Sequence, residues 1–104
     1  MAWVYLTIAG LLEVAWAFTM KQSDGFTRPL DTALTAVFAL SSFALLAMAM
    51  RSLPLGTAYM IWTGIGAVGA FIVGIVVLGE AATLPRLIAA GLILAGIVTM
   101  KLSH

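Results

Sequence analysis

Long uncharged runs separated by short charged segments constrain this sequence more than any other feature. Between Asp31 and Arg51, nineteen consecutive residues carry no formal charge, which is about the helix length that roughly 30 Å of hydrocarbon requires. Of the 104 residues, 63% are hydrophobic and only 9% are charged, which leaves too little polar surface to coat a water-soluble globule of this size. The sequence therefore predicts a membrane protein.

Charged residues, glycines and prolines divide the chain into four predicted membrane-spanning helices. Gly25 suits the left-handed conformation that follows many helices, and Pro54 disfavours helix in the residue before it, so the chain turns there. Only fourteen residues separate Arg86 from Lys101, so both basic side chains must extend toward the membrane surfaces. The continuous apolar runs exclude a β-barrel, whose strands alternate in hydrophobicity. We expect one all-α membrane domain over residues 1–104, with helices at about 3–22, 31–51, 55–78 and 84–102.

Several classes of function lack their characteristic residues. The chain has no cysteine and a single histidine, His104, so neither a thiolate site nor an imidazole cluster for a metal is expected. We find no nucleotide-binding motif and no hydrolytic triad. The formal net charge is +1 and the basic residues are scattered singly, which does not fit nucleic-acid binding. We therefore expect a protein that is not an enzyme and uses no cofactor and no metal.

Glu13 lies deep inside the first predicted helix. Glu13 follows Trp3 by ten positions, which correspond to about 15 Å along a helix and place the carboxylate near the middle of the membrane. An ionisable group at that depth is costly and is by default a functional residue, and transporter sites lie at the same depth. Helical spacing places Gly10 and Trp16 on the face of Glu13. We expect Gly10 to leave open space one turn from the carboxylate.

Polar side chains of the second and third predicted helices are candidates for the same site. Tyr59 and Trp62 share one helical face, and their O–H and N–H groups need partners that Glu13 is able to provide. Tyr59 also fits the aromatic belt at the membrane surface, because it lies about one turn after Gly56. Ser42 either belongs to the site or bonds to a carbonyl of its own helix. The spacing leaves these alternatives open.

Small residues suggest where helices approach one another. Gly66 and Gly74 belong to a stripe of small residues in the third predicted helix that admits a close neighbour. Gly64 and Gly66 together weaken that helix near the membrane centre, and we interpret this stretch as a hinge. Four spans are few for enclosing a solute, so we expect an oligomer. Gly91 and Ala95 in the fourth helix provide either a dimer seam or ordinary packing.

Basic residues are nearly balanced between the two ends of the predicted helices. With four spans, Arg51 and Lys101 lie on one side of the membrane, whereas Lys21, Arg28 and Arg86 lie on the other. Orientation normally follows a clear excess of Lys and Arg on the cytoplasmic side. The near balance predicts either insertion in both orientations, which allows an inverted dimer, or an orientation set by a single charge.

Two segments resemble the small multidrug resistance family. They are AGLLEVAW, which contains Glu13, and LPLGTAYMIWTGIG, which runs from Leu53 to Gly66; with the length and the four spans, the resemblance covers essentially the whole chain. Trp16, the GFTR loop at 25–28, Ser42 and the WTGIG run are similar to the guanidinium-exporter branch. Leu40 stands where the polyaromatic drug exporters of the family usually carry a tyrosine.

The resemblance implies an antiparallel, dual-topology homodimer in the bacterial inner membrane that exchanges guanidinium-type cations for protons. It implies that Glu13 of both subunits is the shared proton and substrate site. The surrounding residues would be Trp16, Ser42, Tyr59 and Trp62, with Gly64, Gly66 and Gly69 in the flexing segment. Two other functions are compatible with a carboxylate in the membrane. One is export of quaternary ammonium drugs, and the other is a proton-conducting or structural subunit, which Tyr59 and Trp62 on one face disfavour.

Overall fold

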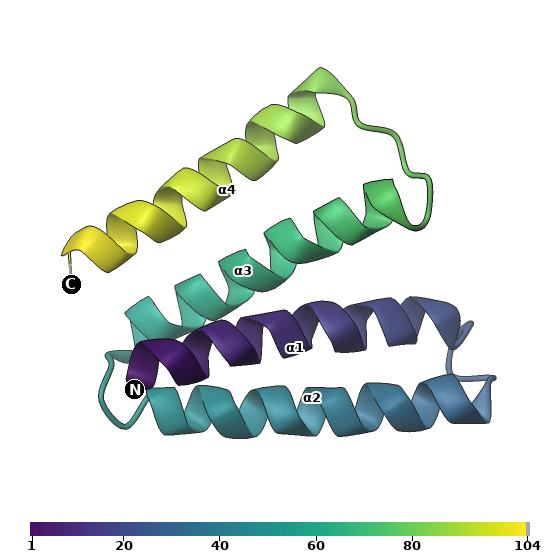
Figure 1. Cartoon of the computed structure of the whole chain (residues 1–104), viewed down its shortest axis with the longest axis horizontal. Coiled ribbons are helices and arrows are strands. Elements are labelled where there is room, and N and C mark those ends of the chain that lie inside the picture. The colour runs from purple at the N-terminus through teal and green to yellow at the C-terminus, as the bar shows by residue number, and fades with distance from the viewer. Residues whose placement is uncertain (104) are drawn as a thin grey trace.

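Four helices make up the computed structural model, which describes residues 1–103. They are α1 (Ala2–Gln22), α2 (Pro29–Ala49), α3 (Leu55–Val76) and α4 (Leu84–Ser103). By length and composition, all four are able to cross a membrane. This confirms the all-α membrane fold with four spans. Figure 1 shows that successive helices run in opposite directions, so the ends of α1 and α3 near residues 22 and 76 lie at one end of the bundle, together with the start of α4. We call this the 22/76 end.

The bounds of α2 and α3 differ from the expected ones by two residues. Helix α2 begins at Pro29 because proline, with its fixed φ and no amide hydrogen, suits the first helical position. Helix α3 ends at Val76, and Gly79 then takes a φ of +71°, which glycine adopts without steric cost. The amide of Glu80 donates to the carbonyl of Gly74 at 2.9 Å. This bond closes the end of α3 and turns the chain toward α4.

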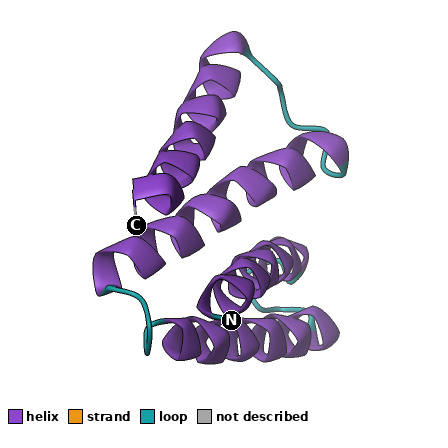
Figure 2. Ribbon diagram, turned by 60° about the vertical axis from the view of Figure 1, so that its left-hand side comes forward, coloured by secondary structure: helices purple, strands orange, loops and turns teal. Residues whose placement is uncertain are grey.

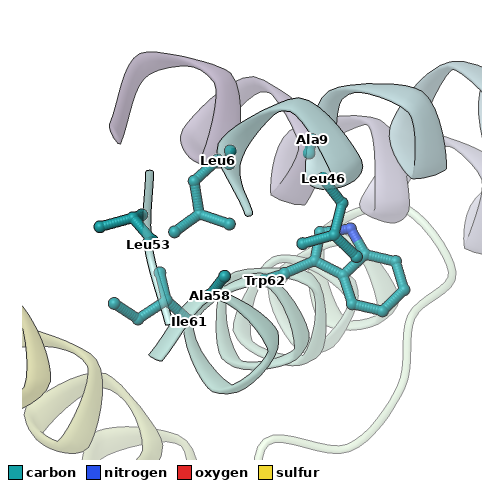
Figure 3. Close-up of a cluster of buried hydrophobic side chains, with 8 residues drawn as sticks. Leu6, Ala9, Leu46, Leu53, Ala58, Ile61 and Trp62 are labelled. Atoms are coloured by element: carbon teal, nitrogen blue, oxygen red, sulfur yellow. The ribbon is translucent and has the colours of Figure 1, made fainter. Parts of the chain in front are cut away.

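Helix α1 lies between α2 and α3 and packs against both, whereas α4 packs along α3 and reaches α1 through the Lys101 ammonium, which lies 5.5 Å from the centre of the Trp3 ring. Figures 1 and 2 show α4 diverging from α3 toward the loop that joins them. Figure 3 shows most of the buried apolar cluster between the first three helices. Its members are Leu6, Ala9, Leu46, Ala49, Leu53, Ala58, Ile61 and Trp62. None of them comes from α4, in which no residue is buried.

Two hydrogen bonds between buried side chains and the neighbouring helix tie α1 to α2. The Ser42 hydroxyl of α2 lies 2.6 Å from the Ala9 carbonyl of α1, to which it donates. Nearer the 22/76 end, the hydroxyl oxygens of Thr35 and Thr19 are 2.8 Å apart. Because buried hydroxyl groups need partners, these bonds fix the register of the two helices.

Candidate functional site

The Glu13 carboxylate lies at the contact between α1 and α3. It packs against Gly66, where a Cβ atom would overlap Glu13 Oε1. Within residues 1–103, this Oε1 is buried and has no hydrogen-bond partner. A buried polar atom without a partner is costly, so such an atom in a native structure calls for a ligand, a proton or water. The geometry therefore places an unused acceptor inside the membrane-spanning region.

Ser42 connects three helices. Its fully buried hydroxyl donates to the Ala9 carbonyl and accepts a hydrogen bond from Trp62 Nε1 at 2.9 Å. Of the two interpretations left open by the sequence, bonding within its own helix is therefore wrong in this structure. The expected pairing of Trp62 with Glu13 is also absent, because the indole N–H points to Ser42 instead.

Four aromatic rings form a row beside this serine. The ring centroids of Tyr59 and Trp62 lie 5.6 Å apart, and those of Trp62 and Phe43 lie 5.8 Å apart. Phe43 and Trp16 meet edge to face, with their ring centroids 6.3 Å apart. Tyr59, at the end of the row, is 52% exposed. Trp16 Nε1 is buried and has no partner among the described residues. The row therefore carries a second unused polar group, this time a donor.

Phe43 is missing from the residues predicted for this site. It is 47% exposed, and its ring lies between those of Trp16 in α1 and Trp62 in α3 and contacts both. The only feature of the sequence that pointed to Phe43 was its position next to Ser42. Neighbouring residues of a helix differ by about 100° in direction, so this signal does not tell whether Phe43 faces the site.

The glycines predicted around the site have different neighbours. The expected open space at Gly10 is absent, because a Cβ there would lie 2.6 Å from Cγ2 of Ile65. Gly10 instead allows α3 to approach α1. Gly69 does the same against Val14, whereas Gly64 faces α4, where a Cβ would lie 2.7 Å from Cδ1 of Ile97. Helix α3 is continuous through all these positions.

The residues predicted from the sequence thus fall into two adjoining groups. Glu13 and Gly66 form the contact between α1 and α3, and Ser42, Trp62, Trp16 and Tyr59 belong to the aromatic row. No group of three or more His, Cys, Asp or Glu side chains able to hold a metal occurs within residues 1–103. Glu13 lies about one helical turn from Trp16, and Gly66 about one turn from Trp62. A free carboxylate oxygen at this distance from aromatic side chains is suited to a proton or an organic cation.

These features define a multi-pass membrane protein with a carboxylate inside its helix bundle. The chain belongs to the small multidrug resistance protein family, whose model matches residues 1–93. It is 58% identical over 103 residues to a protein of Yersinia pestis named guanidinium exporter, covering 99% of both chains. Proteins of the same name from Citrobacter freundii and Salmonella typhimurium are 55% identical over 103 residues, covering 99% of this chain and 98% of theirs. With its four spanning helices, the chain is a multi-pass protein of the inner membrane.

Proposed function

We propose that this chain is a proton-coupled antiporter that exports guanidinium and small substituted guanidinium cations. The observation that carries the proposal is the buried, unpartnered Oε1 of Glu13 in a chain 55–58% identical to proteins named guanidinium exporter. Guanidinium is flat, and its N–H donors meet a carboxylate in a two-bond fork, which is among the stronger hydrogen-bonding arrangements in proteins. Glu13 supplies the acceptor that such a cation needs.

The aromatic row supplies the other parts of the proposed site. The faces of Trp16 and Trp62 attract a cation and exclude water from it. Ser42 uses its single proton on the Ala9 carbonyl and one acceptor position on Trp62, which leaves one acceptor position for a substrate N–H. The exposed Tyr59 adds a hydroxyl at the edge of the site.

The transporting unit in this proposal is an antiparallel homodimer in which both subunits contribute Glu13. Two features of the single chain support it. First, Tyr59 at one end of the aromatic row and Phe43 between Trp62 and Trp16 are both exposed, so a second copy would complete the enclosure. Second, the basic residues are nearly balanced between the two ends of the helices, two against three, which favours insertion in both orientations. Inverted repeats give other transporters the same alternating access.

Competition between protons and guanidinium would couple the two fluxes. A protonated Glu13 carries no charge and offers a poorer acceptor, so proton binding releases the cation. On the side with more protons, guanidinium leaves and the protonated carrier returns. On the other side the proton leaves and the next cation binds. Because each ligand occupies the same carboxylates, the proton gradient drives export without chemistry on a phosphate.

Uptake into vesicles that contain the purified protein tests this function. We expect a pH gradient to drive guanidinium uptake and to drive little uptake of tetramethylammonium, which has no N–H donor for the carboxylate fork. Glu13→Gln should insert and dimerise but should not couple transport to protons. Equal transport of both cations would favour a quaternary ammonium exporter instead. Proton flux that is independent of any organic cation would favour a proton-conducting subunit.

A further inference from the structure

A groove runs between α3 and α4 on the side of the bundle that faces away from α1. Near the 22/76 end it forms a cavity of about 210 Å³, lined by Ala67, Val68, Phe71, Arg86, Ala89, Ala90 and Ile93. A second cavity, of about 310 Å³, shares Ala67 and Ile93 with the first and continues toward Tyr59 and Met60. Apart from Arg86, the first cavity is lined by apolar side chains.

On α4, the lining of the first cavity runs from Arg86, two residues after the helix begins, to Ile93. This separation of seven residues corresponds to about 10 Å of helix, and on α3 the lining runs from Ala67 to Phe71. The first cavity therefore extends about 10 Å inward from Arg86, and the second cavity continues it toward Tyr59. A cavity of this shape between two spanning helices fits the acyl chain of a phospholipid.

Arg86 lines the groove at its surface end, and its ion-pair partner Glu80 lines the neighbouring cavity, which also contains Lys21. Arg86 Nη2 lies 3.3 Å from Glu80 Oε1, Nη1 donates to the Ala81 carbonyl at 2.6 Å, and the guanidinium lies 5.2 Å above the centre of the Phe71 ring. These two hydrogen bonds use two of the five N–H donors of the arginine. Both charged side chains are more than 40% exposed, so each has capacity left for a second partner.

The charge at this end of the bundle matches a zwitterion better than an anion. Lys21, Arg28 and Arg86 are balanced by acidic residues of equal number, namely Asp24, Asp31 and Glu80. A phosphate bound to Arg86 would lie beside the Glu80 carboxylate, which is already paired with Arg86 and favours a further cation with N–H donors over a second anion at the same place. A primary ammonium linked to that phosphate provides one. The headgroup with this chemistry is phosphoethanolamine.

We propose that the groove between α3 and α4 binds one phosphatidylethanolamine molecule per subunit. Its phosphate accepts hydrogen bonds from Arg86, its ammonium donates to Glu80, and one acyl chain lies along Ala67, Ala90 and Ile93. The site does not compete with a dimer seam at Gly91 and Ala95. At about 100° per residue, these two residues lie on the face of α4 opposite to the lining residues Arg86, Ala90 and Ile93.

Native mass spectrometry of the purified, delipidated protein tests the site without any measurement of transport. The lipids to add are phosphatidylethanolamine, phosphatidylglycerol and phosphatidylcholine with identical acyl chains. We expect one tightly bound phosphatidylethanolamine per subunit and weaker binding of the other two, since glycerol lacks the cation and choline lacks N–H donors. Arg86→Gln and Glu80→Gln should each weaken binding about fivefold, the loss expected for one hydrogen bond. Arg51→Gln, at the opposite end, is the matched control and should have no effect.

Filling the groove tests the acyl-chain site independently of the headgroup. Ala90→Phe should reduce phosphatidylethanolamine binding, whereas Ala33→Phe, on an exposed position of α2, should not. Equal binding of the three lipids, or unchanged binding by Ala90→Phe, would overturn the proposal. If Glu80→Gln instead binds phosphatidylglycerol more strongly than the unsubstituted chain binds phosphatidylethanolamine, the site is one for phosphate alone. That result would overturn the assignment of the ammonium to Glu80. If Ala90→Phe breaks the dimer and leaves lipid binding unchanged, a second copy of the chain covers the groove, and the lipid assignment is wrong.

Discussion

Removing the Ser42 hydroxyl should weaken both the fold and the binding of guanidinium. In Ser42→Ala, the Ala9 carbonyl loses a hydrogen bond of 2.6 Å, and Trp62 Nε1, now bonded at 2.9 Å, loses its acceptor. The Trp62 side chain is only 7% exposed, so water reaches this N–H poorly. A buried donor left unpaired costs about 1–3 kcal/mol. We expect the free energy of unfolding to fall by about that amount.

The same substitution removes one acceptor from the proposed substrate site. A single hydrogen bond contributes about 1 kcal/mol, so guanidinium affinity should fall roughly fivefold. Calorimetric titration with guanidinium and thermal unfolding in detergent measure the two effects. Ser41→Ala, which changes an exposed neighbour on α2, is the control and should alter neither value.

A double-mutant cycle separates the bond between Ser42 and Trp62 from other effects of the substitution. Trp62→Phe removes the N–H and keeps most of the ring. If the bond contributes as described, the unfolding cost of the double variant should be smaller than the sum of the two single costs. Additive costs would show that the two groups act independently. Unchanged guanidinium affinity in Ser42→Ala would remove this hydroxyl from the binding site.

Three other predictions concern Glu13, its neighbour Gly66 and the orientation of the chain. If protons and guanidinium exclude each other at Glu13, the apparent affinity for guanidinium should fall as pH is lowered, by up to about tenfold per pH unit for each proton displaced. A guanidinium affinity that is independent of pH, with no protons released on binding, would contradict this exchange. Gly66→Ala places a methyl group where the Glu13 carboxylate lies and should lower guanidinium uptake about fivefold or more. The methyl group of Gly96→Ala meets open space, so this control variant should keep its uptake. Equal uptake by both variants would show that the contact between Gly66 and Glu13 is dispensable. Two or three lysines added after His104 should bias the C-terminus toward the cytoplasm and lower transport activity. Co-expression of an oppositely biased variant should restore transport. Full transport activity from a population with one orientation would refute the antiparallel dimer.

The number of helices was predictable because hydrocarbon excludes charged residues and unpaired backbone groups from every span in the same way. An uncharged run such as the one between Asp31 and Arg51 must form a helix in hydrocarbon, since no other local structure satisfies its backbone. The small shifts at Pro29 and Val76 arise from local end geometry, which hydrophobicity does not record. Hydrophobicity therefore gives the number of helices and places their ends to within about two residues.

The contacts within the site were less predictable, because they depend on which helices become neighbours. Helical spacing correctly placed Gly10 on the face of Glu13 but did not reveal that Ile65 of α3 fills the space beside it. It likewise gave no reason to pair Trp62 with Ser42 rather than with Glu13. The first outcome follows from the close approach of α3 to α1, and the second from the position of α3 beside Ser42 of α2. Both are relations between segments that are distant in the sequence.

The absence of buried residues in α4 has a consequence for the order in which the chain folds. Every buried apolar side chain among the described residues lies before residue 63, and the glycines that bring α1 and α3 together, Gly66 and Gly69, follow within seven residues. The first three helices and the loop before α3 therefore contain every buried apolar side chain among the described residues, and α4 adds only the partly buried Ile97 and Met100 to this cluster. During synthesis, the final helix is therefore added to helices whose buried residues do not include any of its own. Its exposed faces are then free for contacts with lipid or with another subunit, without cost to the interior already formed.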